Sequence, residues 1–361
     1  MNILIDIAHP AHVHLTKNTY FELVKRGHQM FVTVKDTPIA IDILQKLDIP
    51  FIYLGNKKDS LWGKMMLQLL YNYKIWKLVI SKKILIGFGS SVTLAHISKI
   101  SKMKSIILDD DDDEVEPLFV KYAHPFADVI LSPNCIKRAS SETVFYAGYH
   151  ELAYLHPNHF IPNPDILKEI GVTENEPYFI LRFNAFKAHH DIGAQGLSIE
   201  NKRKLIKHLE QKGKVFITTE RDIDEEFLSY QLKISSEKIH SLLYYATMLV
   251  GDSQTMSSET AVLGTPAIRC NTFVGKIACH EEEEHHYGLT YGFLPTQSEA
   301  MFAKIEEILS DKKSKDIWQE KRKKMLSEKI DVTAFYVWFI ENYPESKRIM
   351  QENPEYQYNF K

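Results

Sequence analysis

The sequence is poor in the features that would assign a 361-residue chain to a special class. It has three cysteines and no CxxC spacing, which gives no basis for a disulfide framework and is typical of a reducing compartment. Its 15 glycines and 14 prolines are too few for a collagen-like or disordered chain. The formal net charge of -3 lacks the basic surplus of nucleic-acid-binding proteins, so we expect no nucleic-acid partner.

Long apolar runs are also missing. No stretch approaches the length of about 18 apolar residues that predicts a membrane span. The first residues, MNILIDIAHP, lack the basic start and long apolar core of a signal peptide. We therefore expect a cytoplasmic protein, long enough for two domains of ordinary size.

What the sequence does contain is an alternation of short apolar runs and helical patterns. In the first half we expect strands at 2–7, 30–34, 50–54, 84–89, 104–108 and 128–133. The alternation restarts after a loop at 156–165, with expected strands at 178–183, 214–219, 247–253 and 266–270 and helices at 198–211 and 256–263. Such alternation is typical of βαβ units and mostly parallel sheets. The predicted fold class is α/β.

The domain boundaries follow from this pattern. We expect an N-terminal Rossmann-like domain over 1–160 and a C-terminal one over 161–330. We expect the helical tail over 331–361, which includes TAFYVWFIENY, to pack back on the N-terminal domain.

The segment GDSQTMSSETAVLGTP, residues 251–266, contains the most informative chemistry. An apolar run leads into a hydroxyl-rich turn and then a helix pattern that ends at Gly264. Ligands of open α/β sheets bind outside the carboxyl ends of the strands, where helix N-termini attract phosphate. Ser253, Gln254 and Thr255 would then donate to a diphosphate, and Glu259 would accept from a ribose. Spacing alone is equally satisfied by hydroxyls that only cap the helix.

DSQTMSSETAVLGTPAIR resembles the donor-site segment of GT-B enzymes, namely non-hydrolysing UDP-N-acetylglucosamine 2-epimerases and the N-acetylglucosaminyltransferase of peptidoglycan synthesis. The match to the epimerase spacing runs without a gap from Asp252 through Glu259 to Pro266. The departure is Ser-Gln-Thr in place of Ser-Gly-Gly, which narrows the room for a diphosphate. FELVKRGHQMFVTV and GFGSSVTLAHISKISKMKSIIL resemble the first helix and the Gly-rich turn of GT-B transferases.

Together with AHPAHVHL, FYAGYHELAYL and AHHD, these segments identify the chain as similar to an uncharacterised GT-B-like family, a domain of unknown function. The resemblance implies two Rossmann-like domains whose parallel sheets face a cleft, with a C-terminal helix crossing back. It implies a nucleotide-sugar donor on the second domain and an acceptor, saccharide or lipid-linked, on the first, with Ser90 of the Gly-rich turn near the sugar or acceptor. We expect no cofactor and no bound metal.

Three further clusters are candidates for chemistry. Asp6, His9, His12 and His14 crowd the end of the first strand, where a histidine of near-neutral pKa would deprotonate a sugar hydroxyl. We expect His12 or His14 to be this base, with Asp6 as a third catalytic residue and His9 as an acceptor or sugar contact. The alternative is that these side chains cap the helix or pack.

The other two clusters follow later strands. Arg182 resembles the epimerase arginine that reaches the nucleotide phosphates, and His189, His190 and Asp191 follow it as acceptor or sugar contacts, or else as a solvated loop. In the acidic run DDDDDE, Asp109 and Asp110 emerge directly from a strand and would bind an acceptor or a divalent ion, whereas most of the run is a solvated face. Like charges this close raise one another's pKa.

The stretch SLWGKMMLQLLYNYKIWKLVI, residues 60–80, predicts an apolar helix flanked by lysines. Most of it should be core. A helix so rich in Trp, Met and Tyr also fits a peripheral contact with the inner face of the membrane.

The leading functional hypothesis is a metal-independent GT-B glycosyltransferase that uses a nucleoside-diphosphate sugar, with UDP favoured, in surface polysaccharide or glycoconjugate synthesis. Helix N-termini and Arg182 would stabilise the leaving diphosphate. An epimerase-like enzyme is the first alternative, although Thr-Arg-Pro-Glu and Glu-Ala-Gly-Leu-Arg motifs are absent. A metal-dependent hydrolase built on residues 6–14 and 189–191 is the second, and a non-enzymatic binding protein is the third.

Overall fold

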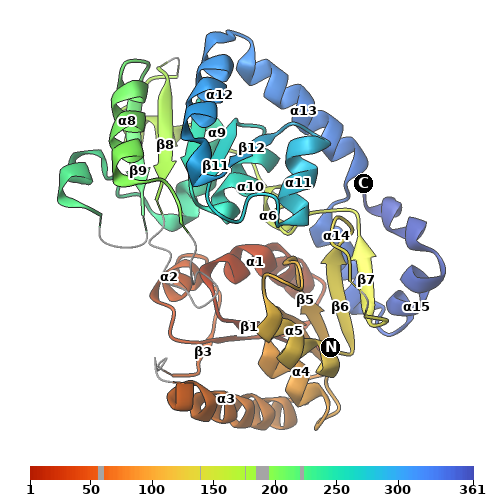
Figure 1. Ribbon diagram of the computed structural model, residues 1–361. Coiled ribbons are helices and arrows are strands. Elements are labelled where there is room, and N and C mark those ends of the chain that lie inside the picture. The colour runs from red at the N-terminus through yellow and green to blue at the C-terminus, as the bar shows by residue number, and fades with distance from the viewer. Residues whose placement is uncertain (56–60, 139, 175, 184–194, 220–222) are drawn as a thin grey trace. The chain divides into compact units, whose positions relative to one another are not determined.

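The computed structural model describes residues 1–55, 61–138, 140–174, 176–183, 195–219 and 223–361 (Figure 1). Within these residues the chain divides into two compact units. Unit 1 consists of Met1–His159 with Lys329–Lys361, and unit 2 consists of Phe160–Glu328. The two units are described separately below.

Unit 1 contains a parallel sheet of seven strands in the order β3-β2-β1-β4-β5-β6-β7. The strands are β1 (Asn2–Ile7), β2 (Gln29–Val34), β3 (Ile52–Tyr53), β4 (Ile86–Gly89), β5 (Lys104–Leu108), β6 (Val129–Pro133) and β7 (Thr143–Tyr146). The chain winds from β1 outward through β2 to β3, then returns to place β4 on the other side of β1. The carboxyl ends of β1 and β4 therefore flank the switch point, where open α/β sheets bind ligands.

Helices cover both faces of this sheet. They are α1 (Pro10–Lys25), α2 (Pro38–Lys46), α3 (Leu61–Lys82), α4 (Val92–Ser98), α5 (Pro117–Ala123), α6 (Leu152–Leu155), α14 (Val332–Glu341) and α15 (Glu345–Glu352). On one face, Ile75 and Val79 of α3 join Leu94 of α4 in a core that includes Leu4 and Ile107 of the sheet. The near-continuous apolar sequences of β1 and β5 reflect this two-sided burial.

The opposite face of the sheet receives α14. Its residue Tyr336 is fully buried, packs edge-on against Phe88 of β4 at 5.4 Å between ring centroids, and donates to the Tyr146 hydroxyl at 2.9 Å. Asp331 caps this helix by accepting from Ala334 N at 3.0 Å. The aromatic tail of the sequence is therefore core material of unit 1.

Unit 2 contains a five-stranded parallel sheet in the order β12-β11-β10-β8-β9. Its strands are β8 (Tyr178–Arg182), β9 (Lys214–Thr218), β10 (Met248–Gly251), β11 (Ala267–Cys270) and β12 (Thr290–Phe293). Its helices are α7 (Asp165–Glu169), α8 (Ile199–Glu210), α9 (Ile239–Tyr245), α10 (Gln254–Val262), α11 (Ala278–His285), α12 (Ser298–Ser310) and α13 (Ser314–Glu328). Here the switch point lies between β8 and β10, since β9 continues to one side of β8 and β10 to the other.

Glycine is favoured for a different reason at each of the two switch points. A Cβ on Gly251 would lie 2.1 Å from the carbonyl oxygen of Arg182, so only glycine fits where β10 meets β8. Gly89 has a φ of +134°, and a Cβ there would lie 3.5 Å from the Asp6 carbonyl oxygen. That distance is an ordinary contact, so glycine is favoured at position 89 by its backbone conformation rather than by lack of space.

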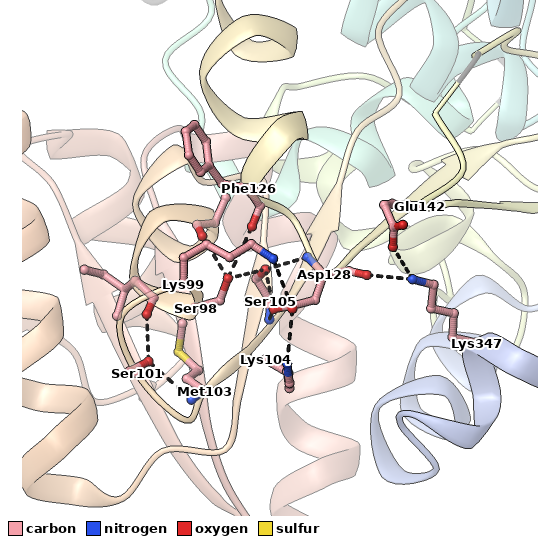
Figure 2. A network of polar contacts seen from close by, with 12 residues as sticks. Ser98, Lys99, Ser101, Met103, Lys104, Ser105, Phe126, Asp128, Glu142 and Lys347 are labelled. Atoms are coloured by element: carbon pink, nitrogen blue, oxygen red, sulfur yellow. Dashed lines mark hydrogen bonds and ion pairs between the residues drawn. The ribbon is translucent and has the colours of Figure 1, made fainter.

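A closed polar group lies at the amino ends of β5 and β6 (Figure 2). Asp128 accepts from Ser105 N at 3.0 Å and from Ser105 Oγ at 3.2 Å, and Lys99 and Lys104 each lie 3.3 Å from its carboxylate. Burial alone would raise the pKa of Asp128, but the Ser105 N–H and the two lysines hold it below its usual value. Lys347 of α15 donates to the Asp128 carbonyl oxygen at 2.9 Å and pairs with Glu142, which fastens the tail to this edge of unit 1.

Candidate functional site

Asp6, at the end of β1, is fully buried and paired on both carboxylate oxygens. Thr33 Oγ1 donates to Oδ1 at 2.7 Å and Ser91 Oγ donates to Oδ2 at 2.5 Å. Lys35 Nζ lies 3.8 Å from Oδ2. Because Asp6 ties β2 and the start of α4 to β1, this geometry favours a positioning role for Asp6 over direct contact with a substrate.

The three histidines that follow Asp6 occupy different environments. His9 is exposed and caps α1, with its Nδ1 accepting from Ala11 N at 3.3 Å. His14 is buried, and its ring packs against Tyr154 of α6 at 5.6 Å between centroids. His12 lies between them, partly exposed, with its ring centroid 6.0 Å from that of His9. Of the two predicted bases, His12 therefore remains the one at the switch point.

The expectation of a near-neutral pKa for His12 is wrong. Burial first, and then the nearby His9, Lys35 and His150, lower the pKa of His12 to about 3 against the opposing effect of Asp110. The ring is thus uncharged at neutral pH. Its Nδ1 accepts from Ala8 N at 3.4 Å, which leaves the proton on Nε2 and makes His12 a hydrogen-bond donor.

The two predicted acidic residues after β5 have different partners. Asp109 is buried between His124 Nε2 at 2.7 Å and Arg138 Nη1 at 2.6 Å, and Arg138 also donates to Ser132 Oγ at 3.1 Å. These bonds order the acidic loop. Asp110 instead places Oδ2 2.9 Å from His150 Nδ1. Of the two aspartates expected to contact an acceptor, Asp110 is therefore the remaining candidate.

The pKa shifts of the acidic loop match this division. Burial would raise the pKa of Asp110, yet His150 and then His12 hold it below its usual value. At Asp111, burial and the neighbouring Asp110 and Asp109 raise the pKa well above its usual value. The predicted repulsion between like charges therefore appears at Asp111 and is overcome at Asp110.

His150 was not among the residues singled out in the sequence. It follows β7 within FYAGYHELAYL, a segment used above only for the family resemblance. β7 was missed as a strand because Thr143–Tyr146, TVFY, contains a single aliphatic residue and lacks the aliphatic run that located the other strands. Ser91 and Lys35 were also missed, although both directly follow strand patterns. Ser90, which was expected near the sugar, follows β4 at the switch point and is partly exposed.

In unit 2 the segment after β10 forms the predicted helix start. Ser253 is the N-cap of α10, since its side chain accepts from Met256 N at 3.4 Å. Gln254 and Thr255 then occupy the first helical turn, where N–H groups have no partner within the helix. The capping alternative therefore holds for Ser253, while Thr255 is exposed. Within the described residues, Gln254 Oε1 is buried and meets no hydrogen-bond partner.

Arg182 ends β8 and lies in register with Gly251, immediately before this turn. Its carbonyl oxygen accepts from Asp252 N at 3.0 Å. The strand ends thus place Arg182 and the N-terminus of α10 at the same switch point. The predicted contacts His189, His190 and Asp191 lie outside the described residues.

Glu259 lies in the second turn of α10 and is buried. Its Oε1 is 3.0 Å from Nε2 of His240, a buried residue of α9. This contact links α10 to α9, so the structure gives Glu259 a packing partner in addition to its predicted role at a ribose. No group of three or more His, Cys, Asp or Glu side chains in the described part of the chain is arranged to hold a metal ion.

Comparison of the sequence with known proteins identifies the family of this chain. Residues 1–278 match the model of the family described as Protein of unknown function (DUF354). The chain belongs to this family. A related, uncharacterised protein of Methanocaldococcus jannaschii is 22% identical over 287 residues, which cover 75% of this chain and 82% of the relative.

Solved structures with a similar fold include a putative 2-epimerase and a glycosyltransferase. A putative UDP-N-acetylglucosamine 2-epimerase from Listeria monocytogenes superposes with a TM-score of 0.64 at 11% identity, covering 88% of this chain and 90% of that one. The spinosyn rhamnosyltransferase SpnG, solved with spinosyn aglycone, has a TM-score of 0.62 at 12% identity, covering 95% and 100%. SpnG has also been solved with thymidine diphosphate.

These similarities confirm the predicted fold class. The DUF354 chain has an α/β, GT-B-like fold with two parallel sheets, and its relation to 2-epimerases and GT-B glycosyltransferases is as the sequence resemblance implied. At such low identity the similarity to solved structures concerns the fold.

Proposed function

We propose that this DUF354 protein is a GT-B-type glycosyltransferase that uses a nucleoside-diphosphate sugar, with a UDP-sugar favoured. One observation carries the proposal: at the switch point of unit 2, Arg182 lies in register with the strand residue that precedes the N-terminus of α10. A guanidinium and free helix N–H groups are the donors that bind a diphosphate. The GT-B-like fold supports the same assignment.

The donor roles follow from this placement. Arg182 and the N–H groups of Gln254 and Thr255 bind the diphosphate, and they stabilise its charge as it leaves. Ser253 orients the turn by capping α10. Glu259 accepts from the ribose with the carboxylate that His240 orients. The acceptor, a saccharide or lipid-linked group of surface polysaccharide or glycoconjugate synthesis, binds at the switch point of unit 1.

Calorimetry with UDP, thymidine diphosphate, GDP and CMP tests the donor site. We expect at least one nucleoside diphosphate to bind the wild-type chain. Arg182→Ala should weaken binding by about 10- to 100-fold, the effect of losing a hydrogen bond between charged groups. Failure of all four nucleotides to bind the wild type would refute the proposal.

A matched pair of variants at one position sharpens this test. Gln254→Glu places a carboxylate in the first turn of α10, where it should repel the diphosphate and weaken binding by at least about tenfold. Gln254→Gly gives the Ser-Gly pattern of the epimerases and should leave binding equal or stronger. Equal affinities for both variants would place the diphosphate elsewhere.

The epimerase alternative differs in its need for an acceptor. UDP-N-acetylglucosamine incubated alone with the protein should show no exchange of its C2 configuration by NMR. Formation of the C2 epimer without any acceptor would replace the transferase proposal by the epimerase one.

The exposed face of α3 supports a membrane contact for the acceptor side. Six apolar side chains on this helix are 37–59% exposed: Met66, Leu69, Leu70, Tyr73, Trp76 and Ile80. Their spacing of three, four and seven residues places them on one face of the helix, opposite Ile75 and Val79, which lie in the core. An exposed apolar stripe of this length marks an interaction surface.

The chemistry of this stripe favours a lipid surface. The Tyr73 and Trp76 rings stack at 6.4 Å between centroids, and such amphipathic rings prefer the membrane interface. Lys77, Lys82 and Lys83 are exposed on or beside the stripe and would attract anionic headgroups. No helix in the described residues is long and apolar enough to cross a membrane, so the proposed contact is peripheral.

Vesicle sedimentation tests the membrane contact. The wild-type chain should bind phosphatidylcholine vesicles that contain phosphatidylglycerol, and Leu69→Ser with Trp76→Ser should weaken binding at least about tenfold through lost apolar burial. The matched control is Leu118→Ser, an equally exposed leucine of α5 outside the stripe. Dimerisation that the same double variant abolishes, without vesicle binding, would contradict the proposal.

A further inference from the structure

His150 and Asp110 form a pair whose geometry is that of a histidine held by a carboxylate. His150 Nδ1 lies 2.9 Å from Asp110 Oδ2, and the His150 side chain is only 9% exposed. Because a carboxylate only accepts, Nδ1 carries the proton and Nε2 carries the lone pair. Nε2 is therefore the basic atom of the neutral ring.

The Nε2 atom of His150 is buried. Among the residues that the structure describes, it has no hydrogen-bond partner. Buried polar atoms without a partner are a small minority in folded proteins, and a catalytic role or a bound water or ion is among the reasons for them. The second histidine of the acidic loop behaves differently, since His124 commits its Nε2 to Asp109 at 2.7 Å.

The charges around His150 come from several elements. Asp110 follows β5, His12 begins α1, and each acts electrostatically on the pair. His9 and Lys35 both lower the pKa of His12. Asp110 and Glu151 both raise the pKa values of two buried tyrosines, Tyr146 and Tyr336. Asp110 is the nearest anion to His150, so a proton arriving at Nε2 would be stabilised by the carboxylate across the ring.

We propose that His150, oriented by Asp110, is the general base that deprotonates the acceptor hydroxyl, and that His12 donates a hydrogen bond to the same acceptor. His12 lies within electrostatic range of His150. In the step, Nε2 of His150 takes the hydroxyl proton while the hydroxyl oxygen forms a bond to the anomeric carbon. The bond from that carbon to the donor phosphate oxygen breaks, and its electron pair leaves with the nucleoside diphosphate. This assignment rests on the proposed transferase function.

The test uses the nucleotide sugar whose nucleotide binds in calorimetry, with water as the acceptor and release of the nucleoside diphosphate as the signal. His150→Gln should lower kcat at least 100-fold, because general base catalysis contributes about 10²- to 10⁴-fold. The same variant should remove the fall in kcat toward acid pH and leave the nucleotide Kd within twofold. Asp110→Asn should lower kcat and keep the acid limb, as expected of a positioning residue.

His124→Gln is the matched control, since it removes the other histidine–aspartate pair of the loop. We expect it to change the melting temperature and to keep kcat within about threefold, by the same reasoning. A His150→Gln variant that folds, binds nucleotide and keeps the wild-type kcat and pH profile would overturn the base assignment. Absence of nucleotide binding by the wild type would instead refute the proposed function.

A readout independent of turnover uses nitrogen-15 NMR of the histidine rings. At a pH where His150 is neutral, the wild type should show the proton on Nδ1 and a bare Nε2. His12 should show the opposite tautomer. A proton on Nε2 of His150 would overturn the assignment even if nucleotide binds.

Discussion

The two ends of the unit 1 sheet use the same kinds of side chain in different ways. At the amino ends, Asp128 is surrounded by Ser105, Lys99 and Lys104, and each named polar atom has a protein partner (Figure 2). At the carboxyl ends, Asp110 holds His150 while Nε2 of that ring is unpaired among the described residues.

The difference suggests that the Asp128 group contributes to stability and that the Asp110–His150 pair contributes to the reaction. Where every polar atom has a partner, hydrogen bonds and ion pairs offset the free energy lost on desolvation. The pKa of the Asp128 carboxylate is accordingly lowered. An unpaired atom such as Nε2 of His150 lacks that stabilisation, but its lone pair is available to accept a proton. Asp109 and Asp110 show the same contrast over one residue, since Asp109 is fully engaged by Arg138 and His124.

The largest expected effect on the reaction rate comes from removing the negative charge of Asp110, at the carboxyl ends of the unit 1 strands. Asp110→Asn should lower the rate of nucleotide release about 100-fold, because the imidazolium loses its counter-charge. The free energy of unfolding should change by less than about 1 kcal/mol, since the Asp110 side chain is 39% exposed. Single-turnover kinetics and urea unfolding measure both; a large loss of stability with no loss of rate would erase the contrast.

The equivalent change at the amino end should do the reverse. Asp128→Asn should lower the free energy of unfolding by about 2 kcal/mol, since a buried acceptor of charged donors is lost, and leave the rate unchanged. Because the pKa of Asp128 is lowered on folding, its contribution is present well above its ordinary value of 3.8 and is lost as the pH falls below it. Urea unfolding at pH 7 and pH 3 should therefore show the gap between wild type and variant closing in acid.

A smaller effect is expected from the hydroxyl that holds Asp6. Ser91→Ala removes the N-cap of α4 and the 2.5 Å bond to Asp6, which should cost about 1–2 kcal/mol of unfolding free energy. Ser101→Ala is the comparison at the other end, where the Ser101 hydroxyl loses its bond to the Ile97 carbonyl oxygen and the bond it accepts from Met103 N. Equal melting temperatures for the two variants would argue against a special role for the Asp6 group.

The smallest effect concerns the charge beside His12. Lys35→Met removes a cation that helps to hold the pKa of His12 near 3. The pKa should rise while remaining below its ordinary value, because burial is the larger cause. An NMR titration of the His12 ring measures this, and an unchanged or lower pKa would contradict the electrostatic account.

The sequence predicted the fold well where apolar runs are long. The runs behind β1, β5 and β8 were located within a residue or two, because strands buried on both faces are apolar throughout. β7 and β12 were missed, since TVFY contains one aliphatic residue and TYGF none, so neither has the aliphatic run that located the other strands. The cap role of Ser253 and the helix end before Gly264 followed from local rules.

The candidate site was predictable only in part. Spacing placed His12 and Asp110 of unit 1 and Arg182 of unit 2 after strands, and parallel topology brings such residues to the carboxyl edge of each unit's own sheet. Spacing could not show that Asp109 meets Arg138 or that Asp110 meets His150, because these partners lie 29 and 40 residues along the chain. The low pKa of His12 depends on burial and on Lys35 from another strand, which no local pattern reveals.

The most direct test of the central claim is a crystal structure of the full chain with bound UDP. Our account predicts the diphosphate within hydrogen-bond distance of the backbone N–H groups of Gln254 and Thr255 and of the Arg182 guanidinium. A nucleotide bound against His12 and His150 of unit 1, with the first turn of α10 unoccupied, would contradict it.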